Sequence, residues 1–123
     1  MASIIVMSGA QKGDYYPLGR RTNVVGRDEG APIQILDEHI SRKHMQIRFD
    51  PDKKQYRALD MKSKHGVFIN GRKISSEIIL ADDDQILIGE TNLLFTDKDF
   101  PDRESALAHF KKVGERKRTT QID

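Results

Sequence analysis

Short segments of apolar and β-branched residues, separated by turn residues, recur along most of this chain. In order they are SIIVM, YYPL, TNVV, IQIL, MQIRF, YRALD, VFI, IIL, QILI and LLFT. A new segment begins roughly every eight to twelve residues, a spacing typical of an all-β sandwich. The stretches between them, such as SGAQKGD, DPDKK and ADDD, are rich in residues that favour turns. The sequence therefore predicts two packed sheets.

The MQIRF segment shows how each strand would lie in such a sandwich. Met45, Ile47 and Phe49 alternate with Gln46 and Arg48. Because side chains point to opposite faces along a strand, this alternation predicts one face in the core and one in water.

The apolar pattern changes to a helical period after residue 100. Asp102 suits the N-cap of a helix, and Gly114 suits its end. One apolar stripe lies between them, formed by Ala106, Leu107, Phe110 and Val113. We predict a β-sandwich domain at residues 1–97, a short C-terminal helix packed on it at 98–114, and a mobile tail at 115–123.

Composition excludes several classes of protein. The chain has 123 residues, enough for one domain, and no apolar run long enough to span a membrane. It has no cysteine, which excludes disulfides, thiol nucleophiles and cysteine-based metal sites. The net charge is only +2, and the basic runs near the C-terminus have no interleaved aromatic residue, so we expect no nucleic-acid partner. Without a signal peptide at the N-terminus, we expect a cytoplasmic protein that does not bind membranes.

Four short motifs carry the chemistry of the chain. Gly26-Arg27 ends a predicted strand, Ser41-Arg42-Lys43-His44 precedes the MQIRF strand, and Ser63 to Gly66 and then Asn70-Gly71 occupy the next two turns. Their order and strand context resemble the forkhead-associated (FHA) domain, whose signature is GR, S-x-x-H, S-x-N-G-T and V-N-G. The resemblance is to a bacterial-type, single-domain member and covers about residues 3–97. It implies a two-sheet sandwich of about eleven strands whose loops at one end bind phosphothreonine in an extended peptide.

The residue types at these motifs suit a phosphate. A phosphate monoester carries about −1.5 to −2 charges and three acceptor oxygens, which favour guanidinium and hydroxyl donors. The resemblance implies that Arg27 and Ser41 contact the phosphate and that Arg42 adds a further contact. Alone, Arg27 could be a solvated charge and Ser41 a turn hydroxyl. Their occurrence together, in the family's order, favours the binding role.

Other motif residues are predicted to support the binding loops. His44 resembles a structural histidine whose ring hydrogen bonds hold these loops. Asn70 and Gly71 predict a tight turn, and Gly26 and Gly66 predict backbone freedom or close approach.

The third motif departs from the family pattern. His65 stands where the family has an asparagine that contacts the peptide backbone, and Lys64 stands where a hydroxyl is common. We expect these two residues to join the peptide-binding site, with higher affinity for phosphate and lower peptide selectivity. An imidazole beside a dianion also predicts that binding depends on pH between about 5.5 and 7.5.

The tail contains a candidate phosphoacceptor. Thr120 lies three residues before Asp123, a spacing that some FHA domains prefer in their ligands, and the basic ERKR run precedes it. The predicted partner is thus a phosphothreonine-containing protein or the chain's own phosphorylated tail, modified at Thr120 or less readily at Thr119, with a Ser/Thr kinase upstream. We expect a monomer unless the tail is phosphorylated. A solvated linker is the simpler alternative for this segment.

Three alternative functions make different demands on the sequence. A hydrolase would pair Ser41 with His44, but no positioned acid or G-x-S-x-G elbow is evident, so no enzyme activity is expected. A metal site would need the four histidines, His39, His44, His65 and His109, to meet the acidic residues 82–84, and no ligand spacing supports it. We expect neither metal nor cofactor. The strongest rival is a phospho-independent interaction scaffold with the same fold, which Lys64 and His65 favour and the pairing of Arg27 with Ser41 opposes.

Overall fold

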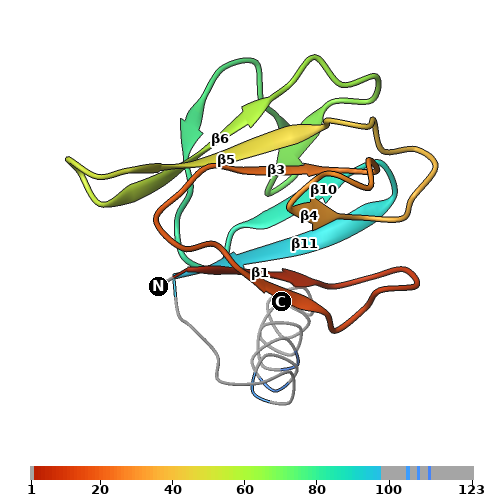
Figure 1. The fold of residues 1–123 in the computed structure, drawn as a ribbon, viewed down its shortest axis with the longest axis horizontal. Helices are drawn as coiled ribbons and strands as arrows, with labels where there is room; N and C mark the ends of the chain where they lie inside the picture. The colour runs from red at the N-terminus through yellow and green to blue at the C-terminus, as the bar shows by residue number, and fades with distance from the viewer. Residues whose placement is uncertain (1, 98–104, 106–107, 109–110, 112–123) are drawn as a thin grey trace, which may run out of the picture.

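The chain forms two β-sheets that pack face to face, with eleven strands in all (Figure 1). This architecture comes from a computed structural model that describes residues 2–97 and the single residues 105, 108 and 111. The predicted all-β sandwich is thereby confirmed. The predicted helix at 98–114 and tail at 115–123 fall outside the described residues, apart from those three positions.

Ten of the strands coincide with the ten apolar segments of the sequence. The six-stranded sheet has the order β2-β1-β11-β10-β7-β8 and comprises β1 (Ser3–Val6), β2 (Tyr15–Pro17), β7 (Val67–Ile69), β8 (Arg72–Lys73), β10 (Gln85–Ile88) and β11 (Thr91–Thr96). The five-stranded sheet has the order β4-β3-β5-β6-β9 and comprises β3 (Asn23–Gly26), β4 (Ile33–Gln34), β5 (Met45–Asp50), β6 (Gln55–Asp60) and β9 (Ile78–Ile79). Strand β8 was not predicted, because both of its residues are exposed and charged.

The core lies between the two sheets and follows the alternation read from the sequence. On β5, Met45 and Ile47 are fully buried, while Gln46 and Arg48 are half-buried. The other fully buried large side chains of this core come from both sheets and the loops between them: Ile4, Leu18, Ile33, Ile35, Ile40, Ile86, Ile88 and Leu93. Ile5 and Leu94 are also fully buried, but in a separate cluster with Met7 and Tyr15. Because both sheets contribute to this core, it sets how the loops at the sandwich ends lie relative to one another.

Strand pairing gathers three loops at one end of the sandwich. Met45, at the start of β5, pairs with Val25 near the end of β3 and with Asp60 at the end of β6. The chain after β6 then crosses to the other sheet and enters β7. The loops after β3, before β5 and between β6 and β7 therefore meet at this end, which is also where the sequence places the first three motifs. Among the described residues, no helix is long and apolar enough to cross a membrane.

Candidate functional site

The backbone beyond β3 lies directly against the Ser41–Arg42 segment. Arg27 N–H donates to the Ser41 carbonyl at 3.1 Å, and Asp28 N–H donates to the Arg42 carbonyl at 3.2 Å. A Cβ on Gly26 would lie 2.0 Å from the Arg42 carbonyl oxygen, closer than any side chain can come. Glycine at position 26 is therefore required for the two segments to meet, and its φ is not in the left-handed region.

The Arg27 side chain is exposed but anchored at one nitrogen. Its Nε donates to the Ile40 carbonyl at 3.0 Å. The terminal guanidinium nitrogens make no hydrogen bond to any residue in the described part of the chain. This arrangement orients the guanidinium group and leaves its outer donors open to an anion.

Ser41 links the first loop to the turn before β7. Its Oγ accepts a hydrogen bond from the Lys64 backbone N–H at 3.1 Å. A hydroxyl that accepts one hydrogen bond still has its own proton to donate. The half-buried Ser41 can therefore donate to a ligand oxygen, and the neighbouring Arg42 side chain is exposed.

His44 is fully buried and joins the same two loops through both ring nitrogens. Its Nδ1 lies 3.0 Å from the backbone nitrogen of Ser41, and its Nε2 lies 2.7 Å from the Gly66 carbonyl oxygen. A backbone N–H can only donate and a carbonyl can only accept, so Nδ1 carries no proton and Nε2 carries one. The ring is therefore neutral and in a single tautomer.

The turn between β6 and β7 is stabilised by its own side chains. Asp60 Oδ1 accepts from the Ser63 N–H at 2.9 Å, and Ser63 Oγ accepts from the Gly66 N–H at 3.0 Å. Gly66 has a φ of +85°, in the region that favours glycine. Lys64 and His65 are exposed at the tip of this turn.

His39 lies beside His65, although the sequence did not indicate that His39 belongs to this site. The rings of His39 and His65 are in edge-to-face contact with centroids 5.9 Å apart. His39 Nδ1 also lies 3.4 Å from Asp37 Oδ1 and 3.7 Å from Glu90 Oε2. His39 therefore stands between the imidazole at the loop tip and two carboxylates.

Asp37 fastens the loop before β5 to the turn before β11. It accepts hydrogen bonds from the N–H of His39 at 2.8 Å, the N–H of Glu90 at 2.9 Å and the hydroxyl of Thr91 at 2.8 Å. Burial by itself raises the pKa of Asp37, but these hydrogen bonds outweigh it and lower the pKa below its ordinary value. No sequence signal indicated this contact, since Glu90 lies 53 residues further along the chain.

Asn70 and Gly71 differ from the prediction that they support the binding loops. They form the turn between β7 and β8, at the opposite end of β7 from Gly66. Asn70 Nδ2 donates to Asp84 Oδ1 at 2.9 Å, and Asn70 Oδ1 accepts from the Gln85 N–H at 2.9 Å. Asn70 therefore stabilises the turn before β10. Strand β7 separates it from the loops that it was predicted to support.

The structure brings together the five predicted peptide-binding residues and three of the predicted support residues. The former are Arg27, Ser41, Arg42, Lys64 and His65, and the latter are Gly26, His44 and Gly66. The metal alternative does not assemble within residues 2–97, since both ring nitrogens of His44 are engaged and residues 82–84 lie at the other end. His109, Thr119 and Thr120 are outside the described residues.

A β-sandwich that presents an arginine and a serine on loops joined by a buried histidine has the architecture of a phosphopeptide-binding module. Comparison with known proteins identifies which one. The sequence model of the FHA domain matches residues 23–89, more than half of the chain, so the chain belongs to the FHA domain family. FHA domains are phosphothreonine-binding modules, and they bind without catalysing a reaction.

Individual relatives agree with this assignment. The chain is 31% identical over 94 residues to the oxoglutarate dehydrogenase inhibitor of Corynebacterium jeikeium, covering 76% of this chain but only 63% of that protein. The crystal structure of the FHA domain of CT664 from Chlamydia trachomatis is 31% identical with a TM-score of 0.74, covering 80% of this chain and 98% of that one. Mycobacterium tuberculosis EmbR, solved in complex with a low-affinity phosphopeptide, is 25% identical with a TM-score of 0.71, covering 82% of this chain and 25% of EmbR.

Proposed function

We propose that this chain binds a phosphothreonine in an extended segment of a partner protein and acts as a signalling adaptor downstream of a Ser/Thr kinase, without catalysing a reaction. One observation carries the proposal. Arg27 and Ser41, 14 positions apart in the sequence, are held side by side by the hydrogen bond between the Arg27 N–H and the Ser41 carbonyl. Each of the two side chains keeps a donor that no residue in the described ranges accepts.

The donors match the chemistry of a phosphate dianion. The outer guanidinium nitrogens of Arg27 supply charge-assisted hydrogen bonds, and the Ser41 hydroxyl supplies a neutral one. Arg42 and Lys64 add positive charge on the two adjoining loops. Gly26, His44 and Gly66 keep the loops in this arrangement and do not themselves contact the ligand.

The peptide beside the phosphothreonine meets a different surface from that of the family pattern. His65 takes the place of an asparagine, so an imidazole rather than a carboxamide faces the peptide backbone. A neutral imidazole has one donor and one acceptor, on separate ring atoms, and His39 constrains the ring by edge contact. Contact with the peptide backbone is therefore weaker or differently placed than a carboxamide would give.

The candidate partners are a phosphothreonine-containing protein in the cytoplasm and the chain's own tail phosphorylated at Thr120 or Thr119. In the second case the phosphorylated tail would occupy the site in the same chain or link one chain to the next; otherwise the chain is a monomer. Light scattering on kinase-treated protein separates these modes. Treated protein that stays monomeric with unchanged affinity for added phosphopeptide would exclude both forms of self-binding.

The test of the main proposal is isothermal titration with paired peptides that carry threonine or phosphothreonine in a T-x-x-D context. We expect binding of the phosphorylated peptides only. Arg27→Ala should weaken it by about 10- to 100-fold, since a charge-assisted hydrogen bond is worth about 1.5 to 3 kcal/mol. Lys43→Ala is the matched control, because Lys43 is an exposed cation in the adjoining loop to which we assign no ligand contact.

Two results would contradict the proposal. Equal weakening by Arg27→Ala and Lys43→Ala would mean that only net charge matters. Equal binding of phosphorylated and unphosphorylated peptides would favour the phospho-independent scaffold, the alternative that Lys64 and His65 favour. Thermal melting of each variant shows whether loss of the Arg27 bond to Ile40 has changed the fold.

A further inference from the structure

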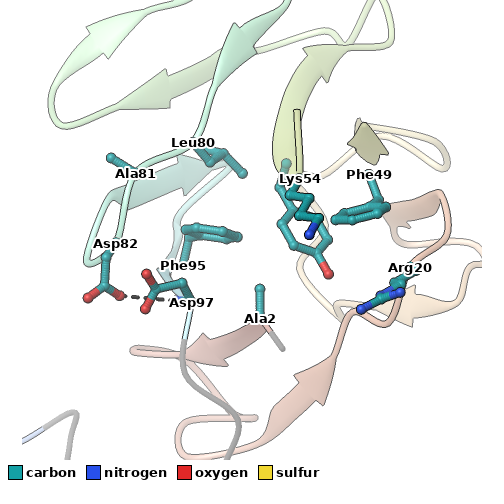
Figure 2. A pocket seen from close by; sticks show the side chains of 10 residues that line it. Ala2, Arg20, Phe49, Lys54, Leu80, Ala81, Asp82, Phe95 and Asp97 are labelled. Carbon is teal, nitrogen blue, oxygen red and sulfur yellow. Dashed lines mark hydrogen bonds between the residues drawn. The ribbon is translucent and has the colours of Figure 1, made fainter. Parts of the chain in front are cut away.

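Two adjoining clefts lie at one end of the sandwich. The phosphate-facing loops, namely those after β3, before β5 and between β6 and β7, lie at the opposite end. The larger has a volume of about 400 Å³ and is shown in Figure 2. The smaller, of about 310 Å³, lies next to it, and both are lined by Arg20, Phe49 and Lys54. Together they form one continuous groove across the far end, formed by the loop between β2 and β3, the hairpin between β5 and β6, and the loop before β10.

The wall of the smaller cleft is basic. Arg20 and Arg21 come from the β2–β3 loop and Lys54 from the β5–β6 hairpin, and all three side chains are exposed. None of the three forms an ion pair or a side-chain hydrogen bond with another residue of the described ranges. Three cations that converge on one cleft without a protein counterion form a site of positive potential.

The Asp50 carboxylate, at the start of the same hairpin as Lys54, does not neutralise this site. Asp50, which ends β5, accepts hydrogen bonds from the N–H groups of Asp52 and Lys53 at 3.0 and 3.3 Å. Its other oxygen lies 3.5 Å from the guanidinium of Arg57 on β6. These contacts lower the pKa of Asp50, and the hydrogen bond from the Lys53 N–H contributes most to the shift. Asp50 is thus committed to the hairpin and to Arg57.

The floor of the groove is aromatic and its far wall is acidic. Phe49 is half-buried, and its ring packs on Tyr56 with centroids 5.0 Å apart; Tyr56 in turn packs on Phe95 at 5.7 Å. In Figure 2, Arg20 and Lys54 lie near Phe49 on one side of the cleft, while Asp82 and Asp97 lie on the other, where Asp82 Oδ1 accepts a hydrogen bond from the Asp97 N–H at 3.0 Å. The groove therefore changes sign along its length, from cationic to anionic, over an apolar floor.

We propose that this groove docks a segment of a protein partner that carries acidic residues, an aromatic or aliphatic residue and then a basic residue. The carboxylates lie against Arg20, Arg21 and Lys54, and the apolar side chain covers Phe49. The basic residue points toward Asp82 and Asp97. The complementarity of charge along the groove selects this occupant over a uniformly acidic or basic one.

The groove is separate from the phosphothreonine site. Strand β5 has six residues and runs from one end to the other, so the two sites are about 20 Å apart. A short phosphopeptide cannot reach both, whereas an intact partner with two segments can, and the second contact then acts at high effective concentration. Docking in the groove requires no phosphate, so this proposal stands or fails independently of phosphothreonine binding.

The experiment is a titration of the isotope-labelled full chain, followed by amide chemical shifts. The probe is the acetylated, amidated hexapeptide EEFAAK, and the control peptide is KKFAAE, which has reversed charges on the same apolar residues. We expect EEFAAK to shift the amides of residues 20–22 and 49–54 and KKFAAE to shift them little. Lys54→Gln and Arg21→Gln should each weaken EEFAAK binding by about two- to fivefold, the range of exposed ion pairs. Lys53→Gln is the matched control, since Lys53 adjoins Lys54 in the hairpin but does not line either cleft.

Three outcomes would overturn the proposal. Equal weakening by Lys53→Gln and Lys54→Gln would show attraction by net charge and no defined site. Shifts confined to residues 41–44 and 64–65 would place the peptide at the phosphate-facing loops. Tighter binding of a ten-residue deoxythymidine oligonucleotide through Arg21 and Lys54 would identify a nucleic-acid surface instead.

Discussion

Replacing His44 by alanine tests the claim that one buried imidazole holds the binding loops. The His44 side chain is fully buried, and it makes one hydrogen bond to the Ser41 N–H and another to the Gly66 carbonyl. In His44→Ala both backbone groups lose their partner, and a cavity the size of an imidazole is left behind. The two loops would still be joined by the bond between the Lys64 N–H and Ser41 Oγ and by the edge contact of the His39 and His65 rings.

The expected loss of stability follows from these contacts. A buried polar group left without a partner costs about 1 to 3 kcal/mol, and the Gly66 carbonyl is in a buried residue. Ser41 is half-buried, so water can compensate part of its loss. We expect His44→Ala to lower the free energy of unfolding by about 2 to 4 kcal/mol, and the melting temperature by about 10 to 20 °C.

Urea unfolding followed by circular dichroism measures this change. His65→Ala is the control, because it removes the same side chain from an exposed position and should change the free energy of unfolding by less than about 0.5 kcal/mol. Phosphopeptide affinity is measured at a temperature where both variants stay folded, and it should fall for His44→Ala. A His44→Ala variant that unfolds at the same urea concentration as the parent would refute the assignment of His44 as the residue that joins the loops.

Three further predictions concern the same end of the sandwich. Gly26→Ala places a Cβ 2.0 Å from the Arg42 carbonyl, so the loop must move; we expect destabilisation of more than about 2 kcal/mol in urea unfolding and loss of phosphopeptide binding in titration. Asp37 has a folded-state pKa below its ordinary value of 3.8, so its stabilisation is present above that pH and is lost as the pH falls through the lowered pKa. Asp37→Asn should therefore cost about 1 to 2 kcal/mol at pH 7, and the difference from the parent should shrink as the pH falls through the lowered pKa of Asp37. His65→Asn should change the affinity for phosphopeptides that differ only in the residues beside the phosphothreonine, measured by isothermal titration; equal affinities in the parent and the variant would count against an imidazole contact with the peptide.

Strand positions followed from local sequence pattern because burial on one face imposes alternation on the side chains. Strand β8 is the exception, because it has no buried face. Strand β8 consists of Arg72 and Lys73, both exposed, and it pairs with β7 only because the Asn70-Gly71 turn reverses the chain. With positive φ at both turn residues, 51° and 84°, the hairpin geometry alone creates the strand. No apolar signal exists for such an element.

The site was predictable to the extent that its residues lie at strand ends in a known order. Arg27 and Ser41 meet because β3 and β5 are paired neighbours. The sequence did not give this pairing, but the family resemblance implied that both residues contact one phosphate. The contacts of Asp37 with Glu90 and of His39 with His65 join loops whose strands lie in different sheets. Alternation assigns a residue to a face of a sheet but does not say which loops of the two sheets meet. Those contacts therefore needed the three-dimensional structure.

The loop contacts also indicate which properties of the site can change independently. The phosphate-facing donors depend on backbone groups, namely the Ser41 N–H, the Gly66 carbonyl and the Lys64 N–H, none of which requires a particular side chain at positions 64 and 65. The side chains of Lys64 and His65 project from the tip of the turn into solvent. Substitutions at these two positions can therefore alter the contact with the peptide beside the phosphothreonine while leaving the phosphate donors in place. We therefore expect the departure from the family pattern at positions 64 and 65 to affect which phosphopeptide is bound more than whether a phosphate is bound.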